Sequence, residues 1–227
     1  RVCSSDLPTI ADQSTPRDAL RVLKRYGIAV PEAVRKVLNQ PTRPVENAAN
    51  SEVRLIAAPA LALQAAALTA RTHGLTPLIL GDAIEGESRE VAVVMAGIAR
   101  SVKQYGHPVV GPAELLSGGE TTATVANGRA GKGGRNTEFL LSLACSLQGE
   151  SGIGAVAGDT GGIDGTEDAA GALVYPDTLA RGKLNGLSAS AYLDAHDSYS
   201  YFHSTGDLVI TGPTLTNVND IRAILIA

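Results

Sequence analysis

The stretch SEVRLIAAPALALQAAALTARTHGLTPLILGDAIEGESREVAVVMAGIARSVKQY, residues 51–105, decides the fold class. Glu52–Ala58 is an apolar run that predicts a strand, and Leu61–His73 is an alanine-rich run that predicts a helix. Pro77–Leu80 predicts a second strand, and apolar residues at helical spacing predict a long helix over Glu87–Tyr105. Because strands and helices alternate, we expect an α/β fold with a parallel sheet and right-handed crossovers.

The composition of the 227 residues supports a layered fold and narrows the partners. Hydrophobic residues make up 44% of the chain, but aromatics only 4%, so aliphatic side chains must build the core. The net charge of -4 argues against nucleic acid or an anionic membrane surface as a partner. The longest apolar run, Leu55–Ala70, is shorter than a membrane span. Cys3 and Cys145 make no disulfide framework, so we expect a cytoplasmic protein.

The chain before residue 51 predicts two short helices after an irregular start. Residues 1–7, RVCSSDL, show neither a period nor a cap; we interpret them as a non-native leader, with a native loop as the alternative. Thr15 is a predicted N-cap, Asp18 completes a capping box, and Gly27 ends the helix. Pro31–Asn39 predicts the second helix.

The prolines between residues 108 and 112 predict a bend into a second region, and we place a domain boundary there. Residues 8–110 are expected to hold the parallel sheet, and residues 111–227 a smaller α/β domain. In the second region, strands are predicted near residues 121–126, 154–157, 208–211 and 221–226, and helices near 136–149, 178–182 and 190–195.

Four polar loops of this second region carry the residue types that hold phosphates and a divalent metal: glycines, hydroxyls, amides and carboxylates. The first is LSGGETT, which contains Ser117, Gly118, Gly119 and Glu120. Its glycines predict a tight turn. Glu120 would then reach a magnesium ion or a substrate hydroxyl, and a plain hairpin turn is the alternative.

The second loop, GGRNTEF, leads into a predicted helix. Arg135 there adds a guanidinium to free backbone N–H groups and a helix dipole, which together predict an anion site. Gly133 and Gly134 let a phosphate approach the backbone, and Asn136 is expected to cap the helix first and to bind ligand second. The alternative is an ordinary helix start with a surface arginine.

The third loop, GDTGGIDGTED, has four acidic residues within ten positions: Asp159, Asp164, Glu167 and Asp168. Acid and glycine at this density indicate metal or polyhydroxyl binding, although the spacing is not that of an EF-hand. Asp164 and Asp168 are the candidate metal ligands. A solvated loop is the alternative.

The fourth loop, TGPTLTNVND, precedes the last predicted strand, and a Gly-Pro turn with hydroxyls fits a phosphate or an oxyanion. A plain turn is the alternative. The candidate ligand-binding residues in it are Thr211, Gly212, Thr214, Thr216 and Asn217.

Three familiar motifs are missing or incomplete. The run after Val53 lacks the G-x-G-x-x-G of dinucleotide-binding proteins, and GKGGR lacks the spacing and the Ser/Thr of a Walker A loop. His196, Asp197 and Ser198 are adjacent in sequence, whereas catalytic triads assemble in space, so we expect a loop with a helix cap.

From about Pro8 to Ile226 the chain resembles the C-terminal half of the glycerate 2-kinases that carry a MOFRL domain. LLSGGETT, GGRNTEF, DGTEDAAGA and DLVITGPTLTNVNDIRAILI match that family in order and spacing, as does GDAIEGESREVA. The resemblance departs at Gly161, where an Asp is common, and at His196, where an Asn usually stands. The family's N-terminal segment, with its cleft lysine, has no counterpart in these residues.

This resemblance implies phosphorylation of D-glycerate at its 2-hydroxyl with ATP and Mg²⁺, in a cleft between a Rossmann-like domain and the MOFRL domain. It places Arg135 in that cleft and leaves a homodimer open. We predict catalytic roles for Arg135, on phosphate charge, and for Glu120 and Asp164, on magnesium or substrate hydroxyls. Two alternatives are a nicotinamide-dependent hydroxypyruvate reductase and a non-catalytic binder of small anions. We expect Arg135→Ala to lower activity about 100-fold or more and, because Arg135 is expected at the surface, to change stability by less than about 0.5 kcal/mol.

Overall fold

The computed structural model describes residues 14–40, 54–125 and 131–227. They belong to two compact units, with the division after Ile56. The proposed leader at residues 1–7 lies outside the described residues, as does the glycine-rich segment 126–130.

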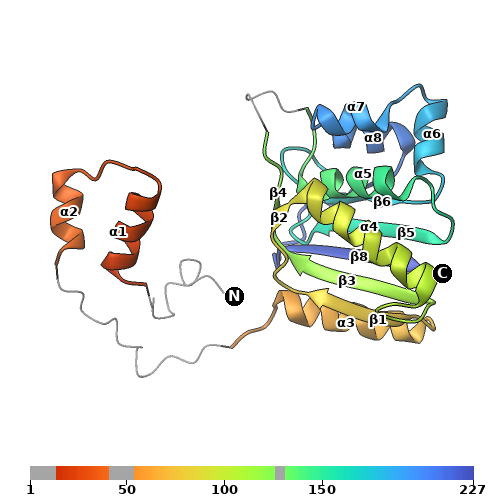
Figure 1. Ribbon diagram of the computed structural model, residues 1–227, viewed down its shortest axis with the longest axis horizontal. Coiled ribbons are helices and arrows are strands. Elements are labelled where there is room, and N and C mark those ends of the chain that lie inside the picture. Colours follow the sequence, from red (N-terminus) through yellow and green to blue (C-terminus); the bar gives the residue numbers. More distant parts are fainter. Residues whose placement is uncertain (1–13, 41–53, 126–130) are drawn as a thin grey trace. The chain divides into compact units, whose positions relative to one another are not determined.

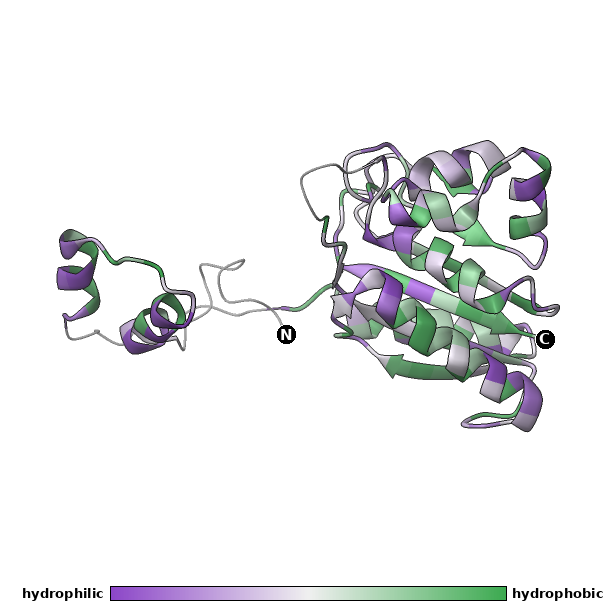
Figure 2. Ribbon diagram, turned by 45° about the horizontal axis from the view of Figure 1, so that its top comes forward, coloured by the Kyte–Doolittle hydropathy of each residue, from purple (hydrophilic) through white to green (hydrophobic). Residues whose placement is uncertain are grey.

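The first unit contains two short helices, α1 (Pro16–Arg25) and α2 (Glu32–Leu38), and the predicted capping box of α1 is confirmed. The backbone N–H of Thr15 donates to the Asp18 carboxylate at 2.9 Å, and the Asp18 N–H donates back to the Thr15 hydroxyl at 3.3 Å. Neither helix buries a residue; Val22, for example, is 52% exposed. Local capping therefore defines these helices, and Figure 2 shows long hydrophilic stretches on both.

The second unit is built on a six-stranded sheet in the order β1-β3-β8-β5-β6-β7 (Figure 1). A separate pair, β2 with β4, lies beside it. In chain order the elements are α3 (Pro59–Thr72), β1 (Thr76–Gly81), β2 (Gly86–Glu87), α4 (Ser88–Tyr105), β3 (Ala113–Gly119), β4 (Thr121–Thr122), α5 (Arg135–Leu147), β5 (Ile153–Asp159), β6 (Gly171–Val174), α6 (Thr178–Leu184), α7 (Ala189–Asp194), α8 (Ser198–Thr205), β7 (Leu208–Val209) and β8 (Asp220–Ile226).

The expected α/β class is confirmed, but the sheet is mixed. Strands β1 and β3 pair in parallel across the crossover helix α4, whereas the pairs β3–β8, β8–β5, β5–β6 and β6–β7 are antiparallel. The predicted strand Glu52–Ala58 is wrong where the structure describes it, because residues 54–58 form no strand. An apolar run becomes a strand only where a neighbour pairs with it.

The sheet also crosses the predicted boundary between residues 110 and 111, since β1 precedes it and β3 follows it. A Rossmann-like portion made of several parallel strands is not seen within the described residues. The division into domains 8–110 and 111–227 stays a prediction.

Helices cover both faces of the sheet, and alternate strand residues serve the two sides. Leu115 and Ile224 belong to the main core, which α4 and α5 cover, while Leu116 packs with Leu63 of α3 on the opposite face. Helices α7 and α8 contact α5, and Tyr201 and Phe202 of α8 complete the main core. Figure 2 shows the sheet strands coloured mainly hydrophobic, so the second unit holds an aliphatic core as expected.

Gly118 and Gly119 end strand β3 and form no hairpin turn, which corrects the predicted tight turn in LSGGETT. Ile84 approaches this strand end, and its N–H donates to the Gly118 carbonyl at 3.0 Å. A Cβ on Gly119, which has a φ of 121°, would lie 2.2 Å from the Ile84 nitrogen. These glycines therefore allow two backbones to cross closely.

Candidate functional site

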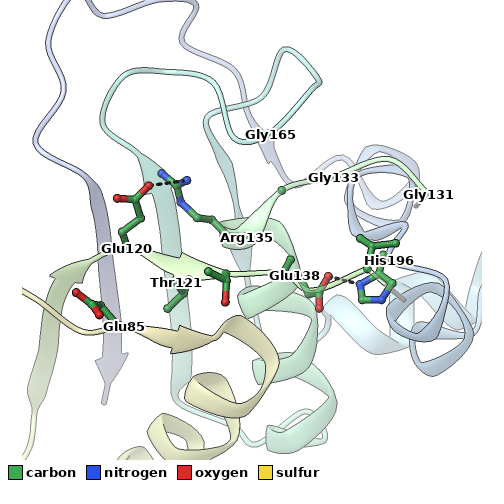
Figure 3. A pocket seen from close by; sticks show the side chains of 13 residues that line it. Glu85, Glu120, Thr121, Gly131, Gly133, Arg135, Glu138, Gly165 and His196 are labelled. Atoms are coloured by element: carbon green, nitrogen blue, oxygen red, sulfur yellow. Dashed lines mark hydrogen bonds and ion pairs between the residues drawn. The ribbon is translucent and has the colours of Figure 1, made fainter. Parts of the chain in front are cut away.

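Arg135, the first residue of α5, is the point where the four predicted loops meet. Its Nε donates to Asp220 at 2.9 Å, and one Nη donates to Asp159 at 2.8 Å. The other Nη forms an ion pair of 3.3 Å with Glu120 (Figure 3). These carboxylates come from TGPTLTNVND, GDTGGIDGTED and LSGGETT, and Arg135 itself comes from GGRNTEF. The loops that sequence analysis singled out therefore form one charged cluster.

Asp220 anchors this cluster beneath the surface. Its side chain is fully buried and also accepts hydrogen bonds from Arg222 at 2.8 Å and from Asn136 at 2.9 Å. Burial lowers the pKa of the fully buried Arg222 below its ordinary value. Burial also acts to lower the pKa of Arg135, but the charges of Asp220, Glu120 and Asp159 together raise it. Arg135 is thus a permanent cation held in a set direction.

This geometry corrects the expectation that Arg135 is a free surface residue. Its side chain is only 26% exposed, and two of its three carboxylate partners, Asp159 and Asp220, are largely or fully buried. Removing the guanidinium would leave buried carboxylates with fewer partners, which costs stability. The predicted near-zero effect of Arg135→Ala on stability does not fit this arrangement.

Asp164 lies at the same end of α5 but caps the helix. Its carboxylate accepts from the backbone N–H groups of Asn136 and Thr137, at 3.1 Å and 2.9 Å, and from the Thr137 hydroxyl at 3.2 Å. Burial raises the pKa of Asp164, against these hydrogen bonds, which lower it. The N-cap position itself is Gly134, so Asn136 does not cap the helix as predicted. A protein carboxylate thus already occupies part of the predicted anion site.

The predicted metal ligands do not converge. Both Asp164 oxygens accept bonds from the start of α5, and Asp168 accepts a hydrogen bond from the Tyr199 hydroxyl at 2.8 Å. No group of three His, Cys, Asp or Glu side chains placed to hold a metal ion occurs in residues 14–40, 54–125 and 131–227. Metal binding by Asp164 and Asp168 stays a prediction.

A cavity of about 610 Å³ opens beside Arg135 (Figure 3). Of the predicted site residues, Glu120, Gly133, Gly134 and Arg135 line it. Ser117, in contrast, is buried in β3 and points its hydroxyl toward the sulfur of Met95. The first two predicted loops therefore form a cavity wall through Glu120 and residues 133–135.

The loop of residues 211–217 does not line this cavity. It lies on the 159–162 loop: the Thr214 N–H donates to the Gly161 carbonyl at 3.1 Å, and the Thr214 hydroxyl donates to the Thr160 carbonyl. The Thr160 hydroxyl in turn donates to the Asn219 carbonyl at 2.7 Å. Phosphate binding by Thr211, Gly212, Thr214, Thr216 and Asn217 stays a prediction.

Sequence analysis missed three residues around the cavity. Glu138, only 3% exposed, is a cavity-lining residue of α5, and its carboxylate lies 2.8 Å from Nδ1 of the cavity-lining His196. Arg89 of α4 donates its Nε to the same carboxylate at 3.0 Å. The spacing could have indicated Glu138, because residues three apart on a helix share a face and Arg135 was already a candidate. Arg89 and His196 gave no such signal, because they are 49 and 58 residues away from Glu138 in the sequence and contact it only in the folded chain.

Comparison with known proteins finds a family match over the region that holds these loops. Residues 113–220 match the model of the MOFRL family. The resemblance to glycerate 2-kinases is also confirmed: the D-glycerate 2-kinase of Thermotoga maritima is 38% identical over 214 residues, which cover 94% of this chain and 50% of that protein.

Other relatives of this chain carry a different name. A protein of Agrobacterium vitis named putative hydroxypyruvate reductase is 59% identical over 220 residues, which cover 96% of this chain and 50% of that protein. The crystal structure of glycerate kinase from Thermotoga maritima superposes with a TM-score of 0.83 at 38% identity, covering 95% of this chain and 51% of that one. The chain therefore spans about half the length of these relatives and matches their C-terminal half.

Within residues 14–40, 54–125 and 131–227, no helix combines the length and the apolar character that a bilayer crossing requires.

Proposed function

We propose that the intact protein phosphorylates the 2-hydroxyl of D-glycerate with MgATP. The observation that carries this proposal is the convergence of Glu120, Asp159 and Asp220 on Arg135 at the wall of a cavity. The similarity to the D-glycerate 2-kinase of Thermotoga maritima supports the choice of reaction.

Arg135 supplies the charge that phosphoryl transfer requires. Such transfer depends on positioning and on neutralising the charge of the phosphoryl oxygens. Asp220 and Asp159 fix the guanidinium at 2.8–2.9 Å, so it needs little reorganisation when that charge develops. Its contact with Glu120 is the longest of the three, 3.3 Å, and Glu120 is 58% exposed. This is the contact that an incoming phosphate would replace.

The residues of the cavity fit a magnesium ion that arrives with a nucleotide. Mg²⁺ commonly binds one or two carboxylates together with substrate phosphates and keeps several waters. Glu120 and Glu85 both line the cavity with exposed side chains, and Glu120 is the residue we assign to the ion. The ion would neutralise phosphate charge there. The volume of about 610 Å³ falls in the range of small-molecule sites.

Reduction of hydroxypyruvate is the second candidate function. The name of the Agrobacterium vitis relative, putative hydroxypyruvate reductase, favours it. The absence of a G-x-G-x-x-G motif from the sequence argues against it. Binding of a small anion without catalysis is the third candidate.

Product analysis on the full-length protein tests these candidates together. With D-glycerate and MgATP, we expect ³¹P NMR to detect 2-phosphoglycerate and ADP in equal amounts. Sole formation of 3-phosphoglycerate, or no glycerate-dependent ADP, would contradict the proposal. A parallel assay with hydroxypyruvate and NADH follows the NADH absorbance at 340 nm. A hydroxypyruvate-dependent decrease in that absorbance would favour the reductase. Ligand binding without either turnover would favour the third candidate.

A further inference from the structure

Arg222 of strand β8 is a fully buried cation behind the Arg135 cluster. One of its Nη atoms donates to Asp220 at 2.8 Å and to the Thr121 hydroxyl at 3.0 Å. Its Nε and its other Nη have no hydrogen-bond partner among the residues that the structure describes. The guanidinium carbon lies 5.4 Å from the centre of the Phe139 ring. An arginine keeps its charge in such surroundings, even though burial lowers its pKa.

A role in core packing explains this buried charge poorly. Buried N–H groups without a partner cost stability, and apolar side chains of similar volume can often replace a buried ion pair without loss. Asp220 has other donors, since it accepts from Arg135 at 2.9 Å and from Asn136 at 2.9 Å. Two residues along the same face of β8, Ile224 belongs to the apolar core. The charge of Arg222 is therefore kept at a cost to the fold, next to the candidate site.

The register of the sheet shows why a second positive charge is useful there. Asp220 of β8 lies directly opposite Asp159 of β5, and like charges in that position destabilise an antiparallel pair. Arg135 bridges the two aspartates and also pairs with Glu120 (Figure 3). Arg222 adds a second guanidinium to this group through Asp220. Without Arg222, three carboxylates would face one guanidinium, and their excess negative charge would repel a phosphate.

The charges of the group balance once a nucleotide binds as proposed. Glu120 then turns from Arg135 to the magnesium ion, and the two aspartates face two guanidinium groups. No excess charge opposes the phosphate, and the Nη of Arg135 that now contacts Glu120 is released for it. Asp164, the other carboxylate at the start of α5, is held separately by backbone N–H groups of that helix.

We infer that Arg222 is a positioning residue for the incoming phosphate: its buried charge offsets that of Asp220, so Arg135 can direct its own charge to the ligand. The inference rests on the proposed function. Arg222 acts without touching the ligand, because it is fully buried and reaches Arg135 through Asp220. Strand β8 is paired on both sides, with β3 and β5, so the positions of Asp220 and Arg222 are well fixed.

The test replaces Arg222 by Met in the full-length protein and measures the binding of AMP-PNP with Mg²⁺ by calorimetry. Methionine removes the charge and keeps an unbranched apolar stem. We expect the affinity to fall by about 10-fold or more, as is common when an outer partner of a binding group is lost. Arg222→Lys keeps the charge and should keep most of the affinity. Arg181→Met is the matched control: Arg181 pairs with the buried Asp207 at 2.9 Å but does not line the cavity, so only stability should fall.

A second substitution separates the charge of Arg222 from its contacts. Asp159→Asn removes one negative charge from the group and keeps an oxygen that can accept from Arg135. In the described part of the chain, no hydrogen bond joins Asp159 to Arg222. Adding Asp159→Asn to Arg222→Met should therefore restore most of the affinity for AMP-PNP but not the free energy of unfolding. A packing role for Arg222 predicts no recovery of either.

Several results would overturn the inference. Equal affinity in Arg222→Met and in a wild type that phosphorylates glycerate would exclude this role for Arg222 and leave the proposed kinase intact. No recovery in the double variant would assign Arg222 to packing. If Arg222→Met does not fold, Arg222→Lys decides, because an affinity loss of about 10-fold or more with the charge kept contradicts the inference. No binding of AMP-PNP by the wild type would overturn the proposed function and the inference together.

Discussion

Two loops of this protein were both predicted from sequence to hold a phosphate, but their surroundings differ. Gly131, Gly133, Gly134 and Arg135 of the first loop line the cavity, whereas residues 211–217 lie on the neighbouring 159–162 loop. Both are rich in the small and polar residues that suit oxyanions. The two loops differ in the hydrogen-bond partners of their polar groups: Thr214 bonds to the backbone of the 159–162 loop, whereas Arg135 pairs with an exposed carboxylate, Glu120, at the cavity. Composition therefore identifies where an anion could be held, but the existing hydrogen bonds decide which group remains available.

Arg135→Ala should have the largest effect on activity. It directly tests whether Arg135, and not residues 211–217, contacts the phosphate. We expect kcat/KM to fall by about 100-fold or more, since losing one donor to a developing anion costs roughly 2.7–4 kcal/mol. Because Asp220 is buried and loses one of its partners, we also expect the free energy of unfolding to fall by about 1–3 kcal/mol. Steady-state kinetics and urea denaturation measure the two effects.

Arg135→Lys serves as the control for that experiment. It keeps the charge but loses the planar fork that now contacts three carboxylates. We expect intermediate stability together with a large loss of activity. Turnover near the wild-type level in Arg135→Ala would return Arg135 to a structural role.

The same glycine substitution in each loop sharpens the comparison. A Cβ on Gly134 would lie 2.4 Å from the Asp164 carboxyl carbon, so Gly134→Ala should cost about 3 kcal/mol or more. A Cβ on Gly212 would meet nothing within 4 Å, and only its φ of 66° opposes an alanine, so Gly212→Ala should cost about 1–2 kcal/mol. Thermal unfolding of both variants checks the order, and a reversed order would contradict the described packing.

Asp164→Ala separates capping from metal binding. It removes the acceptor for two backbone N–H groups of α5, so we expect the free energy of unfolding to fall by about 1–3 kcal/mol. The affinity for Mg²⁺ in the presence of nucleotide should stay unchanged in calorimetry. A loss of Mg²⁺ affinity with normal stability would restore Asp164 as a metal ligand.

Thr214→Val should have the smallest effect. The Thr214 hydroxyl bonds only to backbone carbonyls of its own and the adjacent loop, so stability should fall by about 1 kcal/mol and turnover should remain near wild type. The kinetic assay used for Arg135 applies. A loss of activity as large as that of Arg135→Ala would show that residues 211–217 hold the phosphate after all.

The sequence predicted those features whose determinants are local. The Thr15–Asp18 capping box, helix α4 and strand β8 follow from spacing within a few residues, and the structure contains all three. The prediction of a strand at residues 52–58 is wrong over residues 54–58, which the structure describes. Strand formation depends on a pairing partner elsewhere in the chain, which the local sequence does not contain. The direction of the sheet pairs could not be read for the same reason.

The candidate site was predictable as a set of loops but not as a set of roles. Arg135 and Glu120 were found from residue type and position. The capping role of Asp164 could not be predicted, because a carboxylate 28 residues away from the helix start that it caps leaves no local pattern. The Glu138–His196 contact spans 58 residues, so no spacing rule could have paired them.

The most direct test of the account is a crystal structure of the full-length protein with Mg²⁺ and a non-hydrolysable ATP analogue. We predict that the terminal phosphate lies within hydrogen-bond distance of Arg135, that Glu120 has moved from the guanidinium toward the ion, and that Asp159 and Asp220 keep their contacts with Arg135. Phosphates bound instead by residues 211–217, with Arg135 still paired to all three carboxylates, would contradict it.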